Sequence, residues 1–298
     1  MARILFTLNG HDNIAHAICQ LCDASMGEYA RRQFPDGETY LRIDSTVKDC
    51  DVILLCGLEQ PDDKFLPLVF FARQLKEMGA RSVGLVTPYL AYMRQDRRFM
   101  DGEALTSRHF AKMLSEHFDW LVTVDPHLHR YHSLDEIYTV PSRALQAAPL
   151  LAQFVRGEGD VWLLGPDEES AQWVSVMAET AGVPWAVARK ERFGDRDVRV
   201  TLPDTSAFTG RRAMLVDDVI SSGHTMQRAL LALKAEGFDG SDCLCIHGLF
   251  ADGCDAMLKE AGAARLISCN SILHPSNQVD LGPMIAEAVG SLLDRYSG

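Results

Sequence analysis

The sequence predicts an α/β protein built on mainly parallel sheets, because short apolar runs with strand character alternate with amphipathic stretches. The strand-like runs are residues 4–8, 52–56, 82–86, 121–124, 161–164, 185–188, 213–216 and 243–247. Segments with helical spacing lie between several of them, at residues 66–78, 107–116, 171–181 and 227–235. A chain of 298 residues exceeds the usual size of one hydrophobic core, so two domains are expected.

A domain boundary is expected between residues 141 and 142, where a strand-like run ends at Pro141. The first domain would span residues 1–141 and the second residues 142–281. Residues 284–296 predict a final helix, which begins after Gly282 and Pro283. The two halves echo each other loosely, since residues 122–125 and 215–218 both end a strand in acid. The echo suggests duplicated α/β domains, although no sequence repeat is detectable.

The charge balance argues against nucleic acids and membranes as partners. The chain has 41 acidic against 29 basic residues, a formal net charge of -12, which opposes long-range attraction to nucleic acid or anionic lipid. No apolar run reaches membrane-spanning length, and residues 2–9 have a strand pattern rather than that of a signal peptide. The eight cysteines lack the spacing of a disulfide framework, so a cytoplasmic location is expected.

The stretch of residues 214–226 carries the most information. Its apolar run ends in Asp217 and Asp218, and a turn and helix-forming residues follow. The turn consists of Ser221, Ser222, Gly223, His224 and Thr225. Backbone amides in such a turn, with the positive end of the helix, form a site for anions. A phosphate on the turn and hydroxyls beside the carboxylates would together suit a sugar phosphate.

A second group of polar residues, Asp125, His127 and His129, follows the strand at residues 121–124. A zinc hydrolase could use the pair His127 and His129, with His132 as a third nitrogen and acids from residues 163–170. Alternatively, one imidazole and one carboxylate hold magnesium, which keeps several waters and depends on substrate phosphates. His129 and His132 are expected to be structural.

Three further segments have cationic or turn character. Residues 88–99 combine aromatic side chains with three arginines, which suits triphosphate or adenine contacts, although a solvated charged loop has the same composition. Residues 33–40 predict a turn followed by a strand, as in a plain hairpin. Residues 189–193 could form a mobile cationic loop, suitable as a lid over phosphates. Neither a P-loop nor a Rossmann glycine fingerprint is present in the sequence.

In this order, the motifs resemble those of the ribose-phosphate pyrophosphokinase family, over nearly the whole chain. The family's Phe-x-Asp-Gly-Glu turn matches residues 34–38, and its Pro-Tyr…Tyr-x-Arg-Gln-Asp motif matches residues 88–96. The metal motif Asp-x-His matches residues 125–127, and its Pro-Asp partner matches residues 166–167. The sugar-phosphate loop matches residues 217–225.

The resemblance implies two phosphoribosyltransferase-like domains, each a mainly parallel sheet flanked by helices, with the helix at residues 282–298 packing back on the first domain. It also implies a reaction, in which the C1 hydroxyl of ribose 5-phosphate attacks the β-phosphorus of magnesium-ATP and releases AMP. Mg²⁺ is the implied cofactor, and ATP and ribose 5-phosphate are the implied substrates. A homo-oligomer, a dimer or larger, would share each ATP site between subunits.

The resemblance also assigns roles to residues. The metal ligands would be His127 and Asp167, and ATP would be bound by Arg94 and Gln95. The neighbouring subunit would add Phe34, Asp36, Gly37 and Glu38 to that ATP site. Ribose would face Asp217 and Asp218, with its 5-phosphate on Ser221, Ser222, Gly223, His224 and Thr225. Lys190 and Arg192 would be the catalytic cations on the transferring phosphates, and Arg192 would also contact ribose 5-phosphate.

The sequence departs from the family pattern at several positions. His224 replaces a usual glycine, so the turn must adopt a shape that histidine allows. Glu191 weakens the positive field between the two lid cations, and residues 97–104 resemble the shorter, archaeal-type enzymes. Two alternatives stay open: a phosphoribosyltransferase, which would share only the loop at residues 217–225, and a catalytically silent paralogue with a regulatory role.

Overall fold

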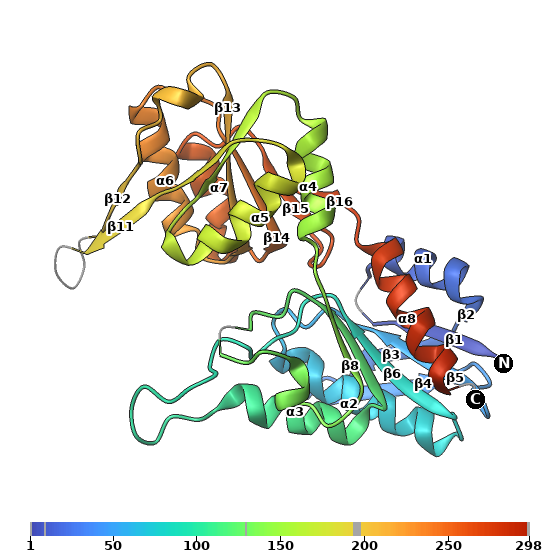
Figure 1. Cartoon of the computed structure of the whole chain (residues 1–298). Helices are drawn as coiled ribbons and strands as arrows, with labels where there is room; N and C mark the ends of the chain where they lie inside the picture. Colours follow the sequence, from blue (N-terminus) through green and yellow to red (C-terminus); the bar gives the residue numbers. More distant parts are fainter. Residues whose placement is uncertain (1, 9, 129, 193–197, 297–298) are drawn as a thin grey trace. The chain divides into compact units, whose positions relative to one another are not determined.

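The computed structural model describes residues 2–8, 10–128, 130–192 and 198–296, without the side chains of residues 190–199, 295 and 296. The chain divides into two units (Figure 1). Unit 1 comprises Met1–Leu145 and Asp280–Gly298, and unit 2 comprises Gln146–Val279. In the described part of the chain, no helix is long and apolar enough to cross a membrane.

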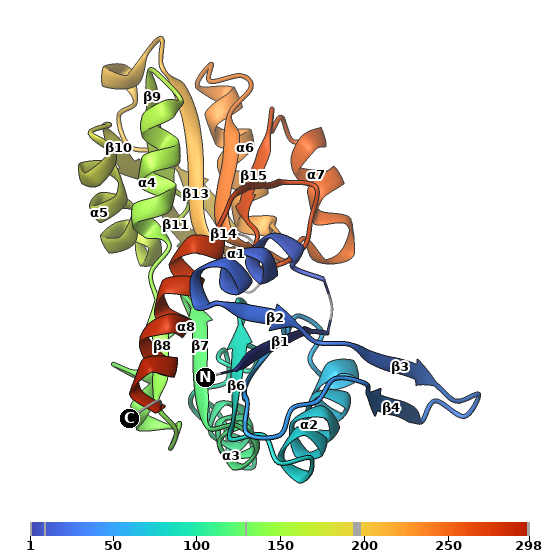
Figure 2. The same ribbon diagram turned by 90° about the vertical axis from the view of Figure 1, so that its right-hand side faces the viewer.

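Unit 1 is built on a six-stranded parallel sheet with the order β2-β1-β5-β6-β7-β8 (Figure 2). Its strands are β1 (Arg3–Thr7), β2 (Ala24–Met26), β5 (Asp51–Leu55), β6 (Ser82–Thr87), β7 (Trp120–Val124) and β8 (Ser142–Leu145). Its helices are α1 (Asp12–Cys22), α2 (Asp62–Glu77), α3 (Thr106–His117) and α8 (Gly282–Tyr296), with a 3₁₀ turn η1 (Leu134–Glu136). A separate antiparallel hairpin joins β3 (Tyr29–Gln33) to β4 (Thr39–Ile43).

Unit 2 is built on a second six-stranded parallel sheet, with the order β10-β9-β13-β14-β15-β16. Its strands are β9 (Val161–Gly165), β10 (Trp185–Val187), β13 (Arg212–Ile220), β14 (Asp242–Gly248), β15 (Leu266–Cys269) and β16 (Asn277–Val279). Its helices are α4 (Ala148–Gly157), α5 (Ala171–Ala181), α6 (His224–Ala235) and α7 (Cys254–Glu260), with 3₁₀ turns η2 (Glu168–Ser170), η3 (Ser206–Phe208) and η4 (Ala251–Gly253). The hairpin of this unit joins β11 (Arg189–Arg192) to β12 (Val198–Thr201).

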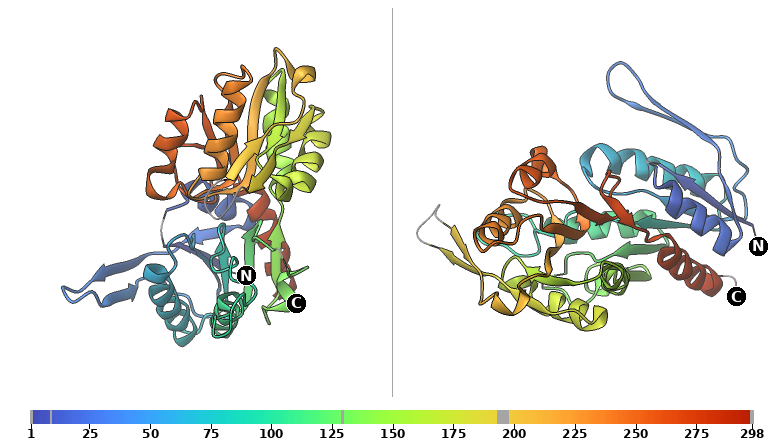
Figure 3. Two further views of the ribbon diagram at one scale, coloured as in Figure 1. Left: turned by 90° about the vertical axis from the view of Figure 1, so that its left-hand side faces the viewer. Right: turned by 90° about the horizontal axis from the view of Figure 1, so that it is seen from above.

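The two sheets have the same strand order. In each unit a hairpin lies, in chain order, between the second and the third strand of the sheet (Figures 1 and 3). The parallel α/β architecture and the duplication predicted from the sequence are therefore confirmed. The proposed echo between residues 122–125 and 215–218 is wrong, however. By strand order, β13 is the counterpart of β5, and β7 is the counterpart of β15.

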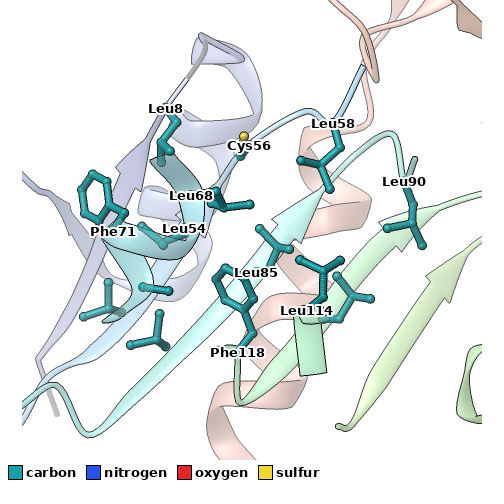
Figure 4. Close-up of a cluster of buried hydrophobic side chains, with 14 of the residues drawn as sticks. Leu8, Leu54, Cys56, Leu58, Leu68, Phe71, Leu85, Leu90, Leu114 and Phe118 are labelled. Atoms are coloured by element: carbon teal, nitrogen blue, oxygen red, sulfur yellow. The ribbon is translucent and has the colours of Figure 1, made fainter. Parts of the chain in front are cut away.

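Strands β5, β6 and β7 of unit 1 and β9 and β14 of unit 2 are buried along their whole length, as expected when both faces of a sheet are covered. In unit 1 the register places Phe6, Leu54, Leu85 and Leu121 side by side across four strands. Leu54 and Leu85 pack there with side chains from α2 and α3, including Leu68, Phe71 and Leu114 (Figure 4). This core fixes the strand ends that carry the polar motifs of unit 1.

The last helix belongs to unit 1 although it follows unit 2 in the chain. Helix α8 packs on α1, where the Cys22 thiol donates a hydrogen bond to the Ala286 carbonyl at 3.4 Å. Near the other end of α8, Arg3 and Asp294 form an ion pair at 2.8 Å.

The boundary between the units lies a few residues later than the sequence suggested. Residues 138–140 do not form a strand, and β8 instead begins directly after Pro141. Because β8 pairs with β7, it completes the sheet of unit 1. The proline thus precedes the strand. This position suits proline, because it has a fixed φ and no amide hydrogen to donate to the neighbouring strand.

A group of ion pairs closes the amino-terminal edge of the sheet in unit 2. Arg265 contacts Asp242 at 2.8 Å and Glu158 at 2.5 Å, and Arg212 contacts Glu158 at 2.6 Å. The Asp242 side chain is only 1% exposed, so its charge depends on these partners. Hydrogen bonds from Arg265 hold the pKa of the Glu158 carboxyl below its usual value.

We expect Arg265→Met to lower the free energy of unfolding of unit 2 by about 3 kcal/mol, because it leaves buried carboxylates without their main cation. Urea unfolding at neutral pH measures this. The difference from wild type should narrow as the pH falls through the lowered pKa of Glu158, because the protonated carboxyl no longer needs the cation. The control is Arg211→Met, whose ion pair with Asp160 is exposed and should contribute less than about 1 kcal/mol. Equal losses in both variants would contradict the role of burial.

Candidate functional site

In unit 2 the turn between β13 and α6 has the geometry of an anion site. Strand β13 ends at Ile220, and α6 begins at His224, with Gly223 at its N-cap in the left-handed conformation (φ 71°). Within the described part of the chain, the amides of residues 222–225 donate no hydrogen bond to another backbone group. These amides are the unpaired donors expected at a helix start, and they are available for an anion.

His224 occupies the first residue of α6 and is not among the residues with positive φ. The left-handed position required by the turn is filled by Gly223 instead. The expectation that the turn adopts a shape that histidine allows is therefore confirmed.

The turn is supported from behind by the segment after β14, which sequence reasoning missed. The amides of Leu249 and Phe250 donate to the Ile220 carbonyl at 2.9 and 3.1 Å, and the amide of Ala251 donates to the Ser221 carbonyl at 3.0 Å. A Cβ added at Gly223 would overlap the Cys254 sulfur, so the glycine lies directly against α7. No pattern in the sequence indicates this contact, because it joins residues more than thirty positions apart.

Three carboxylates gather at the carboxyl ends of β9 and β13, which are neighbours in the sheet. Asp167 lies just beyond β9, where its side chain accepts a hydrogen bond from the Glu169 amide at 3.2 Å. Burial, followed by the negative charges of Asp218 and Asp167, raises the pKa of the Asp217 carboxyl well above its usual value. Such a cluster is stabilised by a cation or by hydroxyl donors.

In unit 1 two predicted motifs meet at one edge of the sheet. Residues 88–96 follow β6 and residues 125–127 follow β7, and these strands are adjacent and parallel. Asp125 has a positive φ of 36°, which is uncommon for a residue other than glycine and typical of functional loops. Its amide donates to the Leu145 carbonyl at 2.8 Å. His127 is half-buried, and Arg94 is exposed.

The predicted plain hairpin at residues 33–40 is confirmed as β3–β4. Its turn is closed by the Phe34 amide on the Glu38 carbonyl at 2.8 Å, with Gly37 in a left-handed conformation (φ 90°). The Arg32 guanidinium lies 4.6 Å from the Phe34 ring and 4.5 Å from the Tyr40 ring. Phe34 is still 38% exposed, and the hairpin extends away from the sheet of unit 1 (Figure 2). An exposed aromatic and carboxylates at this tip could contact a ligand outside their own unit.

Two of the predicted site residues lie in the hairpin of unit 2. The backbone of Lys190 and Arg192 forms β11, so the segment expected to be a loop is a strand there. Their side chains are outside the described residues, and so is His129. The catalytic assignment of the two cations stays a prediction.

The described residues contain no cluster of three or more histidine, cysteine or acidic side chains with metal-binding geometry. A zinc hydrolase would need such a cluster. Magnesium requires fewer protein ligands, since it retains waters and binds substrate phosphates, and the carboxylates beside Asp167 are the oxygen donors that it prefers. These carboxylates are thus of the ligand type that magnesium prefers.

Comparison with known proteins finds matches along most of the chain. The N-terminal domain of ribose phosphate pyrophosphokinase matches residues 3–117, and the phosphoribosyl transferase domain matches residues 133–283. The chain is 31% identical over 283 residues to a ribose-phosphate pyrophosphokinase of Methanopyrus kandleri, covering 94% of this chain and 96% of the relative. It is 31% identical over 258 residues to one of Pyrococcus furiosus, covering 85% and 89%.

A crystal structure shares the fold over the whole length. Phosphoribosylpyrophosphate synthetase from Mycobacterium smegmatis superposes with a TM-score of 0.84 and 24% identity, covering 99% of this chain and 100% of that one. The agreement in fold extends through both units.

Proposed function

The chain belongs to the ribose-phosphate pyrophosphokinase family, and we propose that it transfers the pyrophosphoryl group of magnesium-ATP to ribose 5-phosphate. The C1 hydroxyl oxygen of the sugar forms a bond to the β-phosphorus of ATP, and the bond from that phosphorus to the α–β bridging oxygen breaks. AMP leaves, the hydroxyl loses its proton, and phosphoribosyl diphosphate is formed. The observation that carries the proposal is that one chain contains both the turn of unit 2 with its free helix-start amides and the Arg94–Gln95 and Asp125–His127 motifs of unit 1.

In the proposed reaction, unit 2 binds the sugar phosphate. The amides of Ser221, Ser222, Gly223, His224 and Thr225 would hold the 5-phosphate. Asp217 and Asp218 would accept hydrogen bonds from the ribose hydroxyls. These hydrogen bonds would stabilise the charged form of Asp217, whose pKa is raised first by burial and then by the neighbouring carboxylates.

Unit 1 would bind the nucleotide. Arg94 offers a planar cation suited to phosphates or to a ring face, and Gln95 offers an amide for hydrogen bonds. The hairpin residues Phe34, Asp36, Gly37 and Glu38 would complete the ATP site of a neighbouring copy, so the active form would be a dimer or larger. The exposure of Phe34 at the hairpin tip supports this proposal.

His127 and Asp167 would be the ligands of magnesium. When bound with ATP, magnesium supplies positive charge that neutralises the triphosphate. Lys190 and Arg192 would hold the transferring phosphates, and Arg192 would also contact the sugar phosphate. Transfer of this kind depends on positioning and charge more than on covalent chemistry.

The decisive test is AMP formation from ATP, ribose 5-phosphate and magnesium, with ³¹P NMR identifying a diphosphate on the sugar. A phosphoribosyltransferase would produce no AMP under these conditions, but would consume phosphoribosyl diphosphate when a base is supplied. That alternative does not account for the motifs of unit 1. A silent paralogue would show neither activity, and the retention of Lys190, Arg192, His127 and Asp167 in the sequence argues against it.

We expect Glu38→Ala to raise the KM for ATP at least tenfold and to leave the KM for ribose 5-phosphate within twofold, since loss of a hydrogen bond to a charged group costs about 1.5–3 kcal/mol. The turn should survive, because Glu38 closes it through its backbone. The control is Asp44→Ala at the base of the hairpin. Sedimentation should show at least a dimer for all three proteins. A fully active monomer would refute the shared site.

We also propose a cytoplasmic location. All eight cysteines are free thiols in the structure, and most are buried. Unpaired cysteines in such number suit a reducing compartment.

A further inference from the structure

The nucleotide motif of unit 1 is held by residues to which neither the sequence patterns nor the proposed function assigns a role. Gln95 and Asp96 lie in an irregular segment between β6 and α3, where no regular ladder fixes their positions. Their contacts lead to two places: the first residues of α3, and the residues that follow the Asp125–His127 motif. The nucleotide motif is therefore tied to the metal motif.

The first link between the two motifs is an ion pair. Arg130 Nε lies 3.4 Å from Asp96 Oδ1, and the Asp96 side chain is only 6% exposed. The other carboxylate oxygen of Asp96 is buried with no hydrogen-bond partner within the described part of the chain. The charge of Asp96 is thus compensated mainly by Arg130, which lies three residues after His127.

The second tie is a chain of hydrogen bonds through Ser107. The Ser107 hydroxyl donates to the Gln95 carbonyl at 3.0 Å and lies 3.1 Å from the Tyr131 hydroxyl. Both Ser107 and Tyr131 are buried. Consecutive residues of the nucleotide motif, Gln95 and Asp96, are therefore linked to consecutive residues after the metal motif, Tyr131 and Arg130.

The side chain of Gln95 is also oriented. The Thr106 hydroxyl donates to Gln95 Oε1 at 2.9 Å. With its oxygen occupied in this way, the amide presents its NH₂ group as the donor for an incoming ligand. The fixed orientation suits a ligand acceptor, such as a ring nitrogen or a phosphate oxygen.

We propose that Arg130 and Tyr131 are positioning residues, which hold the Arg94–Gln95 nucleotide motif in a fixed relation to the loop that carries His127. The inference rests on the proposed function, because it takes these two motifs to bind the two parts of magnesium-ATP. Partners of this kind orient the groups that touch a ligand, and their loss typically costs about 10–100-fold in affinity or activity. Arg130 is 45% exposed, so it can be replaced without opening the core.

The test compares Arg130→Met, Arg130→Lys, Asp96→Asn and the double variant Asp96→Asn/Arg130→Met with wild type. Arg108→Met, an exposed arginine on α3, is the matched control. Magnesium-ATP binding is measured by calorimetry without ribose 5-phosphate, and steady-state kinetics are measured with both substrates varied. Thermal unfolding reports on stability in each variant.

For Arg130→Met we expect magnesium-ATP to bind about tenfold more weakly, with a parallel rise in the KM for ATP and a KM for ribose 5-phosphate within twofold of wild type. Arg130→Lys should recover part of the loss, since it keeps the charge. The double variant should bind ATP no more weakly than Asp96→Asn alone, because the two residues act through one contact. Tyr131→Phe should show a smaller loss of the same selectivity.

Unchanged ATP binding in Arg130→Met would overturn the proposal. So would equal losses for both substrates accompanied by a large fall in unfolding temperature, since these would indicate a purely structural ion pair. If Arg130→Met fails to fold, the comparison of Asp96→Asn with the double variant decides. Wild-type protein that binds magnesium-ATP but forms no AMP would reject the proposed function and leave the inference to be judged on binding. Wild type that binds no magnesium-ATP would reject both.

Discussion

Lys190→Ala is expected to lower kcat on the order of 100- to 1,000-fold, the usual effect of removing one preorganised contact to charge that develops in the transition state. The KM values for ATP and ribose 5-phosphate should change much less. A contact made mainly in the transition state contributes to the rate, whereas a contact made equally in the ground state contributes to binding. The assignment comes from family membership and from the position of Lys190 on β11.

Steady-state kinetics with both substrates varied separates these effects. Arg192→Ala should behave like Lys190→Ala, and the double variant should lose less than the sum of the two, because both cations serve the same phosphates. The control is Arg189→Ala, an exposed cation on the same strand. All variants should unfold near the wild-type temperature, since a cation that serves substrate phosphates is expected to contribute little to folding. A Lys190→Ala enzyme that keeps most of its turnover would end the catalytic assignment.

The fold could be predicted from the sequence for most of the strands that are buried along their whole length, although β15 (Leu266–Cys269), which is also fully buried, was not predicted. The strands β5, β6, β7, β9 and β14 are buried along their length and mostly apolar, because both faces of each sheet are covered, and all were predicted. The edge strands β2, β8 and β16 were not predicted. They contain three or four residues and are partly exposed, so they lack a continuous apolar run.

Some parts of the candidate site could likewise be predicted from the sequence, and others could not. The turn at residues 221–225 and the acids before it could be recognised, because their amides and charges are local properties of a short segment. The contacts that hold the site could not. Ser107 with Tyr131, and Gly223 with Cys254, are joined only by the fold, and neither pair has a sequence signature. The side chains of Lys190 and Arg192 remain a matter for mutagenesis.

Gly223→Ala is expected to weaken the binding of ribose 5-phosphate on the order of 100-fold, for two separate reasons. First, the φ of 71° is a left-handed conformation, which costs alanine about 1–2 kcal/mol. If the turn changes shape to avoid this cost, the affinity for ribose 5-phosphate should fall about tenfold. In addition, the new Cβ would overlap the Cys254 sulfur and approach Met257 Cε at 3.2 Å. Because α7 and the backbone after β14 hold the turn from behind, relief of the overlap would displace the amides that are proposed to bind the phosphate.

A second substitution separates the two causes. Cys254→Ala removes the sulfur and should by itself change the KM for ribose 5-phosphate only a few-fold, whereas Gly223→Ala/Cys254→Ala should recover the part due to overlap and leave about a tenfold loss from the backbone. Gly210→Ala is the matched control, because Gly210 has a φ of 87° in the same unit with no atom within 4 Å of an added Cβ. It should lower stability and leave the KM for both substrates unchanged. Magnesium-ATP binding should be unaffected in all four variants. If Gly223→Ala weakens the binding of ATP and leaves the binding of ribose 5-phosphate unchanged, the turn has been assigned to the wrong substrate.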